Sequence, residues 1–313
     1  MAKQMGKIPS RIKRKKERTP AEKAIRKRKR LKYIAVFPTA VTLINALCGF
    51  LSIIYASRGS GVFQEISLLR KTEISFFAMS GYLILFAMIA DLLDGQVARW
   101  SGTASGFGGQ LDSLSDALSF GAAPAFLMFK VMENHFSNEF FSQAGPGLVQ
   151  LAGSWTLFFA IFYTLCTIIR LARFNVENET GLFRYQFFAG LPSPAAAGVV
   201  VSLVVFQEDY IHNIAGRLPE LSSALINITT WLLPFAVLFC GILMVSRIRY
   251  PHLAKRLLRR KKHFVTVLLV LFTGFLAVWN IQLAMILGFW GFALAGFFRG
   301  VFRKFFKQKE PEN

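Results

Sequence analysis

The sequence predicts an all-α integral membrane protein with eight spans. Of its 313 residues, 54% are hydrophobic and only 17% are charged, and the mean hydropathy is +0.44, which is too apolar for one or two soluble domains. A helix needs about 20 mostly apolar residues to cross a bilayer. Eight segments approach that length, and they lie near residues 33–57, 74–98, 110–131, 148–171, 189–207, 227–246, 263–281 and 283–302.

A strongly basic arm, residues 1–32, precedes the first span. It holds fifteen Lys or Arg against only Glu17 and Glu22, so its net charge is +13 and it has too little apolar surface to fold alone. We therefore expect a disordered cytoplasmic arm. In a soluble protein the overall net charge of +20 would suggest a nucleic acid partner, but beside membrane spans it favours the anionic lipid of the cytoplasmic leaflet. We expect lipid, and no nucleic acid, at the arm.

The cations of the later loops predict the topology. Residues 247–262 carry eight Lys or Arg, and residues 303–313 form a second basic segment, whereas the loops at 132–147 and 208–226 carry few cations. Basic loops stay on the cytoplasmic side, and an even number of spans returns the chain to the side from which it starts. We therefore expect both termini, the loop 247–262 and the tail 303–313 to be cytoplasmic.

The last two spans, residues 263–302, look like an addition to a six-helix core. They are rich in Phe and Leu, and they contain no acidic residue. Gly296 and Gly300 form one GxxxG pair, for which ordinary helix packing is favoured over a dimer seam.

Cysteine and histidine carry no metal or disulfide pattern. Cys48, Cys166 and Cys240 fall in apolar stretches without paired spacing, which argues against disulfide scaffolds and zinc ribbons. The four His are scattered, with no HExxH motif, and the chain has no Walker loop. A metal site would therefore have to use carboxylates.

The aspartates are the unusual feature of the chain. It has five Asp, and four of them lie within 26 positions where the second span meets the third: Asp91, Asp94, Asp112 and Asp116. An ionised carboxylate at membrane depth costs several kcal/mol, so such residues normally face a wet cavity, pair with cations or bind metal.

Their spacing predicts one convergent site. At about 100° per residue, Asp91, Asp94, Gly95, Ala98 and Arg99 fall within an arc of roughly 140° on one helix. Gly108, Asp112 and Asp116 follow at intervals of four on the next helix, beyond a loop rich in Gly and Ser. Four like charges repel unless cations neutralise them, and carboxylate oxygens suit Mg²⁺ or Mn²⁺. Two such ions about 4 Å apart clamp a diphosphate during displacement at phosphorus.

These eight residues, at this spacing, resemble the signature of the CDP-alcohol phosphatidyltransferases. Three further stretches look like the phosphatidylserine synthases of bacteria and archaea: LDSLSDALSFGAAP at 111–124, RLARFN at 170–175 and FAGLPSP at 188–194. The resemblance implies a six-helix catalytic core over residues 33–246 and a multi-pass protein of a prokaryotic cell membrane, with a cytoplasmic active site and usually a homodimer. It also implies transfer of a phosphatidyl group from CDP-diacylglycerol to the hydroxyl of L-serine, which releases CMP.

The resemblance also implies roles for individual residues. Asp91, Asp94 and Asp112 would bind two divalent cations, Mg²⁺ or Mn²⁺, and Asp116 would be the general base while lying close enough to coordinate as well. Family positions that contact the CDP moiety correspond to Gly95, Arg99 and Ser105. For the carboxylate of serine, cations near the site are needed, and the candidates are Arg170 and Arg173, with Asn175 as a hydrogen-bonding partner.

Two alternatives remain open from the sequence. A sister enzyme of the same family would use glycerol phosphate or an inositol phosphate, and a phosphorylated acceptor would call for additional cations beside the site. From another class, an ion or proton transporter also places acids at membrane depth. A transporter predicts acids near the bilayer midplane, with repeats and broken helices, whereas here the acids cluster toward the cytoplasmic ends of the spans and no internal repeat is evident.

Overall fold

The computed structural model describes residues 20–59, 61–64, 73–101, 106–137, 146–179, 187–211, 215, 218–251 and 280–306. Within these residues seven helical segments are long and apolar enough to cross a membrane: Thr39–Ser57, Phe76–Gln96, Phe107–His135, Gln150–Glu177, Ser193–Ile211, Pro219–Val245 and Ile281–Phe302. The predicted all-α, multi-pass membrane fold is confirmed. Residues 263–279 of the predicted span 263–281 lie outside the described residues, so the count of eight and the cytoplasmic termini remain predictions.

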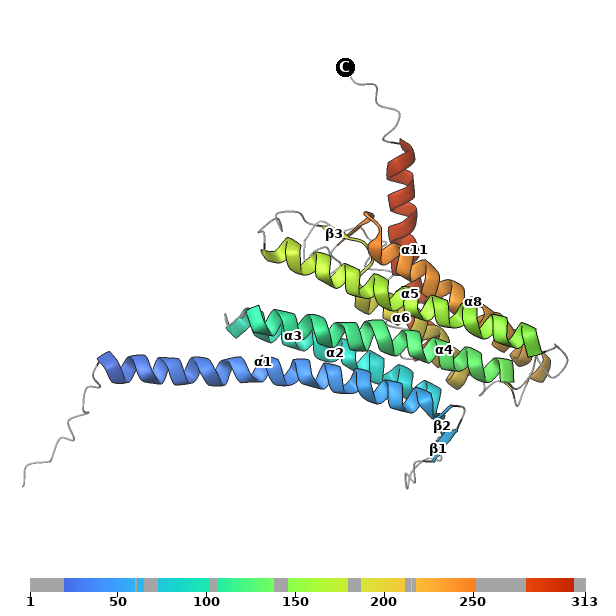
Figure 1. Cartoon of the computed structure of the whole chain (residues 1–313), viewed down its shortest axis with the longest axis horizontal. Helices are drawn as coiled ribbons and strands as arrows, with labels where there is room; N and C mark the ends of the chain where they lie inside the picture. Colours follow the sequence, from blue (N-terminus) through green and yellow to red (C-terminus); the bar gives the residue numbers. More distant parts are fainter. Residues whose placement is uncertain are drawn as a thin grey trace, which may run out of the picture.

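Helix α1, Pro20–Ser57, is longer than its span (Figure 1). Residues 20–32, which the sequence assigns to the basic arm, continue the helix toward the N-terminus. Ala, Glu, Lys and Arg in this stretch have high helix propensity, and Pro suits the first helical position. Residues 1–19 lie outside the described part of the chain. In Figure 1, α1 projects well beyond the other helices.

The second and third spans pack against α1. Helix α2, Phe76–Ser101, lies along α1. The third span is one continuous rod made of α3, Gly106–Asp116, the π-helical turn η1, Ala117–Ala122, and α4, Ala123–His135. A π-helical turn inside an α-helix is uncommon and is often found at functional sites. Here it begins directly after Asp116.

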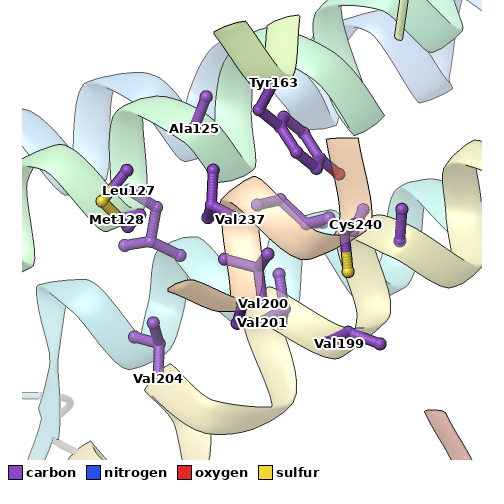
Figure 2. Close-up of a cluster of buried hydrophobic side chains, with 14 of the residues drawn as sticks. Ala125, Leu127, Met128, Tyr163, Val199, Val200, Val201, Val204, Val237 and Cys240 are labelled. Atoms are coloured by element: carbon purple, nitrogen blue, oxygen red, sulfur yellow. The ribbon is translucent and has the colours of Figure 1, made fainter. Parts of the chain in front are cut away.

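Helix α6, Ser193–Val205, lies at the centre of the bundle. It packs against α2, α4, α8 and α11, and its side chains are small or β-branched, so neighbouring helices approach closely. Helix α5, Pro146–Glu179, and helix α8, Pro219–Val245, complete the core. Figure 2 shows valines of α6 packed among Leu127, Tyr163, Val237 and Cys240. The π-helical turn η3, Phe206–Ile211, extends α6.

Two small antiparallel sheets accompany the helices. Strand β1, Val62–Gln64, pairs with β2, Glu73–Ser75. Strand β3, Phe187–Ala189, pairs with β4, Arg249–Pro251, so that Phe188 lies opposite Tyr250. The second sheet joins the segment before α6 to the segment after α8, although these are about sixty residues apart in the chain.

Helix α11, Ile281–Phe306, is the last described span, and it continues four residues into the predicted tail. It packs on α6, η3 and β4. A Cβ atom at Gly296 would overlap the ring of Tyr250, and one at Gly300 would lie 2.7 Å from Ile248. Both glycines therefore let α11 approach other parts of the same chain, as expected from ordinary helix packing.

Candidate active site

Two adjacent helices bring the predicted aspartates together. Asp91 on α2 meets Asp112 and Asp116 on α3, and each offers a carboxylate oxygen within 4.8 Å of the others. The spacing of four residues between Asp112 and Asp116 places them one turn apart on the same face of α3. The sequence prediction of convergent carboxylates therefore holds for these three residues.

Asp94 lies beside this group rather than within it. Its carboxylate interacts electrostatically with Asp91, Asp112 and Asp116, and it accepts hydrogen bonds from the Thr42 side chain and from the backbone N–H of Gly95. The side chain is 4% exposed. Helix α1 thus helps to hold Asp94 in place through Thr42.

Two carboxylate oxygens of the site have no hydrogen-bond partner among the described residues. They are Oδ2 of Asp94 and Oδ1 of Asp112, and both are buried. A buried acceptor without a partner costs about 1–3 kcal/mol, and more when it carries charge. A hard divalent cation prefers oxygen ligands of this kind, so the donor set fits Mg²⁺ or Mn²⁺.

Helix α1 supplies a residue to which the sequence interpretation gave no role. Asn45 is completely buried, and its Nδ2 donates a hydrogen bond of 3.1 Å to Oδ1 of Asp116. The Ser119 hydroxyl of η1 in turn donates to the backbone carbonyl of Asn45 at 2.8 Å. Asp116 is therefore held by α1 as well as by its own helix.

Close packing of α1 on η1 makes this contact possible. A Cβ atom at Gly49 would lie 2.7 Å from the Ser119 Cα, so only glycine allows the two backbones to approach this far. Thr42, Asn45, Gly49 and Ser52 recur at intervals of three and four residues, which places them on one face of an otherwise apolar helix. That polar face is the signal by which Asn45 could have been found.

Arg170 lies on α5 at the edge of the carboxylate group. It is 9% exposed, and its Nη1 donates a hydrogen bond of 2.8 Å to the Ser193 hydroxyl at the start of α6. Its charge interacts with Asp116 and Asp91. The Nε of Arg170 is buried and has no partner among the described residues. A fixed guanidinium with one free donor can receive an anionic group.

The other two predicted acceptor residues lie further along α5. The Arg173 Nη1 donates to the Val245 carbonyl at 3.4 Å, and its Nε lies 3.7 Å from Oε1 of Glu177. Asn175 is joined to Ser113, the neighbour of Asp112, because the Asn175 Nδ2 donates to the Ser113 hydroxyl at 2.9 Å. Of the three residues, Arg170 alone is both buried and charged.

The predicted nucleotide-contacting residues are only partly described. Gly95 is half-buried on α2 beside Asp94, and its missing side chain leaves the backbone accessible to a ligand. The side chain of Arg99 and the whole of Ser105 lie outside the described residues. Their predicted contacts with the CDP moiety therefore stay predictions.

Comparisons with known proteins agree with this site. The model of the CDP-alcohol phosphatidyltransferase family matches residues 35–243, which include all four aspartates. A CDP-diacylglycerol–serine O-phosphatidyltransferase of Helicobacter pylori is 35% identical over 236 residues, which are 75% of this chain and 80% of that protein. One of Methanocaldococcus jannaschii is 34% identical over 169 residues, 54% of this chain and 62% of that protein. An archaetidylserine synthase of Methanothermobacter thermautotrophicus is 31% identical over 226 residues, 71% of this chain and 72% of that protein.

Proposed function

The chain belongs to the CDP-alcohol phosphatidyltransferase family, and on this premise we propose that it transfers a phosphatidyl group from CDP-diacylglycerol to the hydroxyl of L-serine. The products are phosphatidylserine and CMP. The observation that carries the proposal is the group of Asp91, Asp112 and Asp116 carboxylates within 4.8 Å of one another. Family membership makes the chain an enzyme, which argues against the transporter alternative.

The four aspartates divide into two roles. Asp91, Asp94 and Asp112 hold two divalent cations, Mg²⁺ or Mn²⁺, and Asp116 lies close enough to contribute an oxygen. When bound, these ions neutralise the diphosphate and the charge that develops on the CMP leaving group. Asp116 takes the proton of the serine hydroxyl as the hydroxyl oxygen attacks phosphorus. The hydrogen bond from Asn45 fixes the Asp116 carboxylate in one orientation for that transfer.

The two substrates are assigned to different residues around the carboxylates. Gly95, Arg99 and Ser105 contact the CDP moiety, where the absence of a side chain at Gly95 lets a phosphate approach the helix. Arg170 receives the serine carboxylate, and its Nε is a donor without a partner among the described residues, while Arg173 and Asn175 assist in binding the acceptor. The buried position of Arg170 supports this role, because a guanidinium shielded from water binds an anion more strongly than an exposed one.

An acceptor competition tests the proposed function. Purified protein receives CDP-diacylglycerol with equal concentrations of L-serine, glycerol phosphate and inositol phosphate, and the lipid products are separated and identified. We expect phosphatidylserine as the main product, since one buried guanidinium suits a single carboxylate better than a phosphate dianion. A phosphatidylglycerol phosphate or phosphatidylinositol phosphate product would assign the chain to a sister activity of the same family.

The basic arm is proposed to bind the anionic lipid surface on the cytoplasmic side, and the same orientation would place the aspartates toward the cytoplasm. Deleting residues 2–30 is expected to leave kcat within about twofold, because residues 20–30, the described part of the deleted segment, contribute no residue to the carboxylate site. In neutral nanodiscs, the full-length protein should bind anionic vesicles at low salt and lose this binding at high salt, because salt screens the attraction. The shortened protein should not bind them even at low salt, because the deletion removes the positive charge. A large loss of turnover on deletion would contradict the assignment.

The remaining proposals concern assembly and location. The relatives named above come from bacteria and archaea, which supports a prokaryotic cell membrane. A homodimer is proposed on the family resemblance alone, and the mass of the protein in detergent would test it.

A further inference from the structure

Helix α11 packs on the core through α6 and β4. Helix α11 meets α6 where a Cβ atom at Gly198 would overlap the ring of Phe289. Further along, Tyr250 of β4 lies against it: the Tyr250 ring centroid is 5.6 Å from that of Phe292, and its hydroxyl donates to the Ala293 carbonyl at 3.3 Å. Tyr250 is completely buried. Burial raises the pKa of the Tyr250 phenol, so it remains a hydrogen-bond donor at neutral pH.

The Tyr250 ring and helix α11 pack so closely that neither can shift without displacing the other. Gly296 faces the Tyr250 ring so closely that a single added Cβ atom would overlap it. Gly300, one turn later, faces Ile248 on the same segment. The segment 248–250 is therefore held between the end of α8 and the face of α11.

From Tyr250 an unbroken series of backbone hydrogen bonds leads to the start of α6. Strand β4 pairs with β3, and the Gly190 N–H then donates to the Ile248 carbonyl at 2.8 Å. The next N–H, of Leu191, donates to the Leu243 carbonyl at 3.0 Å. Gly190 has a φ of +84°, and a Cβ atom there would overlap the Met244 carbonyl oxygen, so this turn requires glycine.

The turn ends at the residue that holds Arg170. Ser193 lies three residues after Gly190, is completely buried, and accepts the 2.8 Å hydrogen bond from the Arg170 Nη1. The paired segment that α11 supports therefore leads directly into Ser193 and contributes to the position of its hydroxyl. A guanidinium binds a carboxylate well only when its planar set of donors is aligned with it.

We propose that α11 is a positioning element for the acceptor subsite: through Tyr250 and the β3–β4 pair it fixes Ser193, and Ser193 orients Arg170 toward the acceptor carboxylate. This inference rests on the proposed function, because it assigns the acceptor to Arg170. It gives the last helix, which lies beyond the family match at residue 243, a role in substrate selection.

Gly296→Leu tests the proposal directly. The new side chain displaces the Tyr250 ring. We therefore expect the KM for serine to rise about 10-fold, which corresponds to the loss of one charge-assisted contact at Arg170. The KM for CDP-diacylglycerol and kcat should stay within about twofold. The matched control is Gly291→Leu on the same helix, where an added Cβ atom meets nothing within 4 Å, and it should behave as wild type. If Gly296→Leu fails to insert, Gly296→Ala adds only the overlapping atom and should give a smaller change in the same direction.

A double-mutant comparison separates positioning from general destabilisation. In an Arg170→Gln background, where the guanidinium is already gone, Gly296→Leu should not raise the KM for serine further. If Gly296→Leu raises the KM for serine by the same factor in the Arg170→Gln background as in the wild type, the proposal is overturned. An unchanged KM for serine in both Gly296→Leu and Gly296→Ala would overturn it as well. Should the wild-type enzyme make no serine-containing lipid at all, the failure would belong to the proposed function, and the same cycle would be run with the acceptor that is used.

Discussion

Asp91→Asn is expected to lower turnover by at least about 10³-fold and to weaken the binding of metal and nucleotide together. Asp91 offers an oxygen to the same small group as Asp112 and Asp116. With one ligand neutral, the remaining carboxylates bind a divalent cation less tightly, and the diphosphate loses the charge that anchors it. Chelation of the wild-type enzyme with EDTA should have the same effect, and Mg²⁺ or Mn²⁺ should reverse it.

Thermal stability gives a second measurement that does not depend on activity. Carboxylates this close repel one another in the metal-free protein, so removing one of them relieves part of this repulsion. The metal-free variant should therefore melt a few degrees above the metal-free wild type, about 2–4 °C per kcal/mol. Added Mg²⁺ should raise the Tm of the wild type but not that of the variant, because only the wild type has the complete site.

The fifth aspartate of the chain provides the matched control. Asp209 lies on η3, outside the carboxylate group, and accepts a hydrogen bond from the Tyr82 hydroxyl. Asp209→Asn makes the same chemical change, keeps an acceptor for Tyr82, and should retain turnover and the stabilisation by Mg²⁺. Full activity of thoroughly chelated wild-type protein would refute the metal mechanism.

The spans could be predicted from the sequence because the bilayer imposes a simple requirement. Each backbone amide in hydrocarbon must be satisfied within its own helix, so a run of about 20 apolar residues marks a span. The ends of the helices could not be predicted in the same way. Helix α8 begins at Pro219, eight residues before the predicted span at 227, because a helix continues into polar residues beyond the membrane. The same reason lets α1 begin at Pro20.

The carboxylate site was also predictable, since its residues are close in the chain and their spacing determines which helix face they share. Its neighbours were not. Asn45 and Asp116 are 71 residues apart, and Arg170 and Ser193 are 23 apart. A repeating pattern shows which face of a helix is polar, but not which other helix covers that face. The pairing of β3 with β4 leaves even less trace, because three-residue strands carry no readable alternation.

Asp116→Asn is expected to separate proton transfer from metal binding. Asp116 is buried at 8% exposure, and it stands one turn after Asp112, so it can face the attacking hydroxyl while its neighbour holds metal. The substituted amide keeps the shape of the side chain and can still accept the Asn45 hydrogen bond, but it cannot take a proton. General base catalysis contributes about 10²- to 10⁴-fold, so kcat should fall on that scale while affinity for CDP-diacylglycerol changes little.

Two companion variants decide between the possible roles of Asp116. Asp94→Asn should lose nucleotide affinity as well as rate, because it removes charge from the metal site. Asn45→Ala keeps the base but frees its carboxylate from the 3.1 Å hydrogen bond, so we expect a smaller loss of kcat, about 10-fold, with binding unchanged. If Asp116→Asn instead loses binding to the same extent as Asp94→Asn, Asp116 acts chiefly as a metal ligand. Near-normal turnover in Asp116→Asn would exclude it as the base, and another carboxylate of the group would have to accept the serine proton.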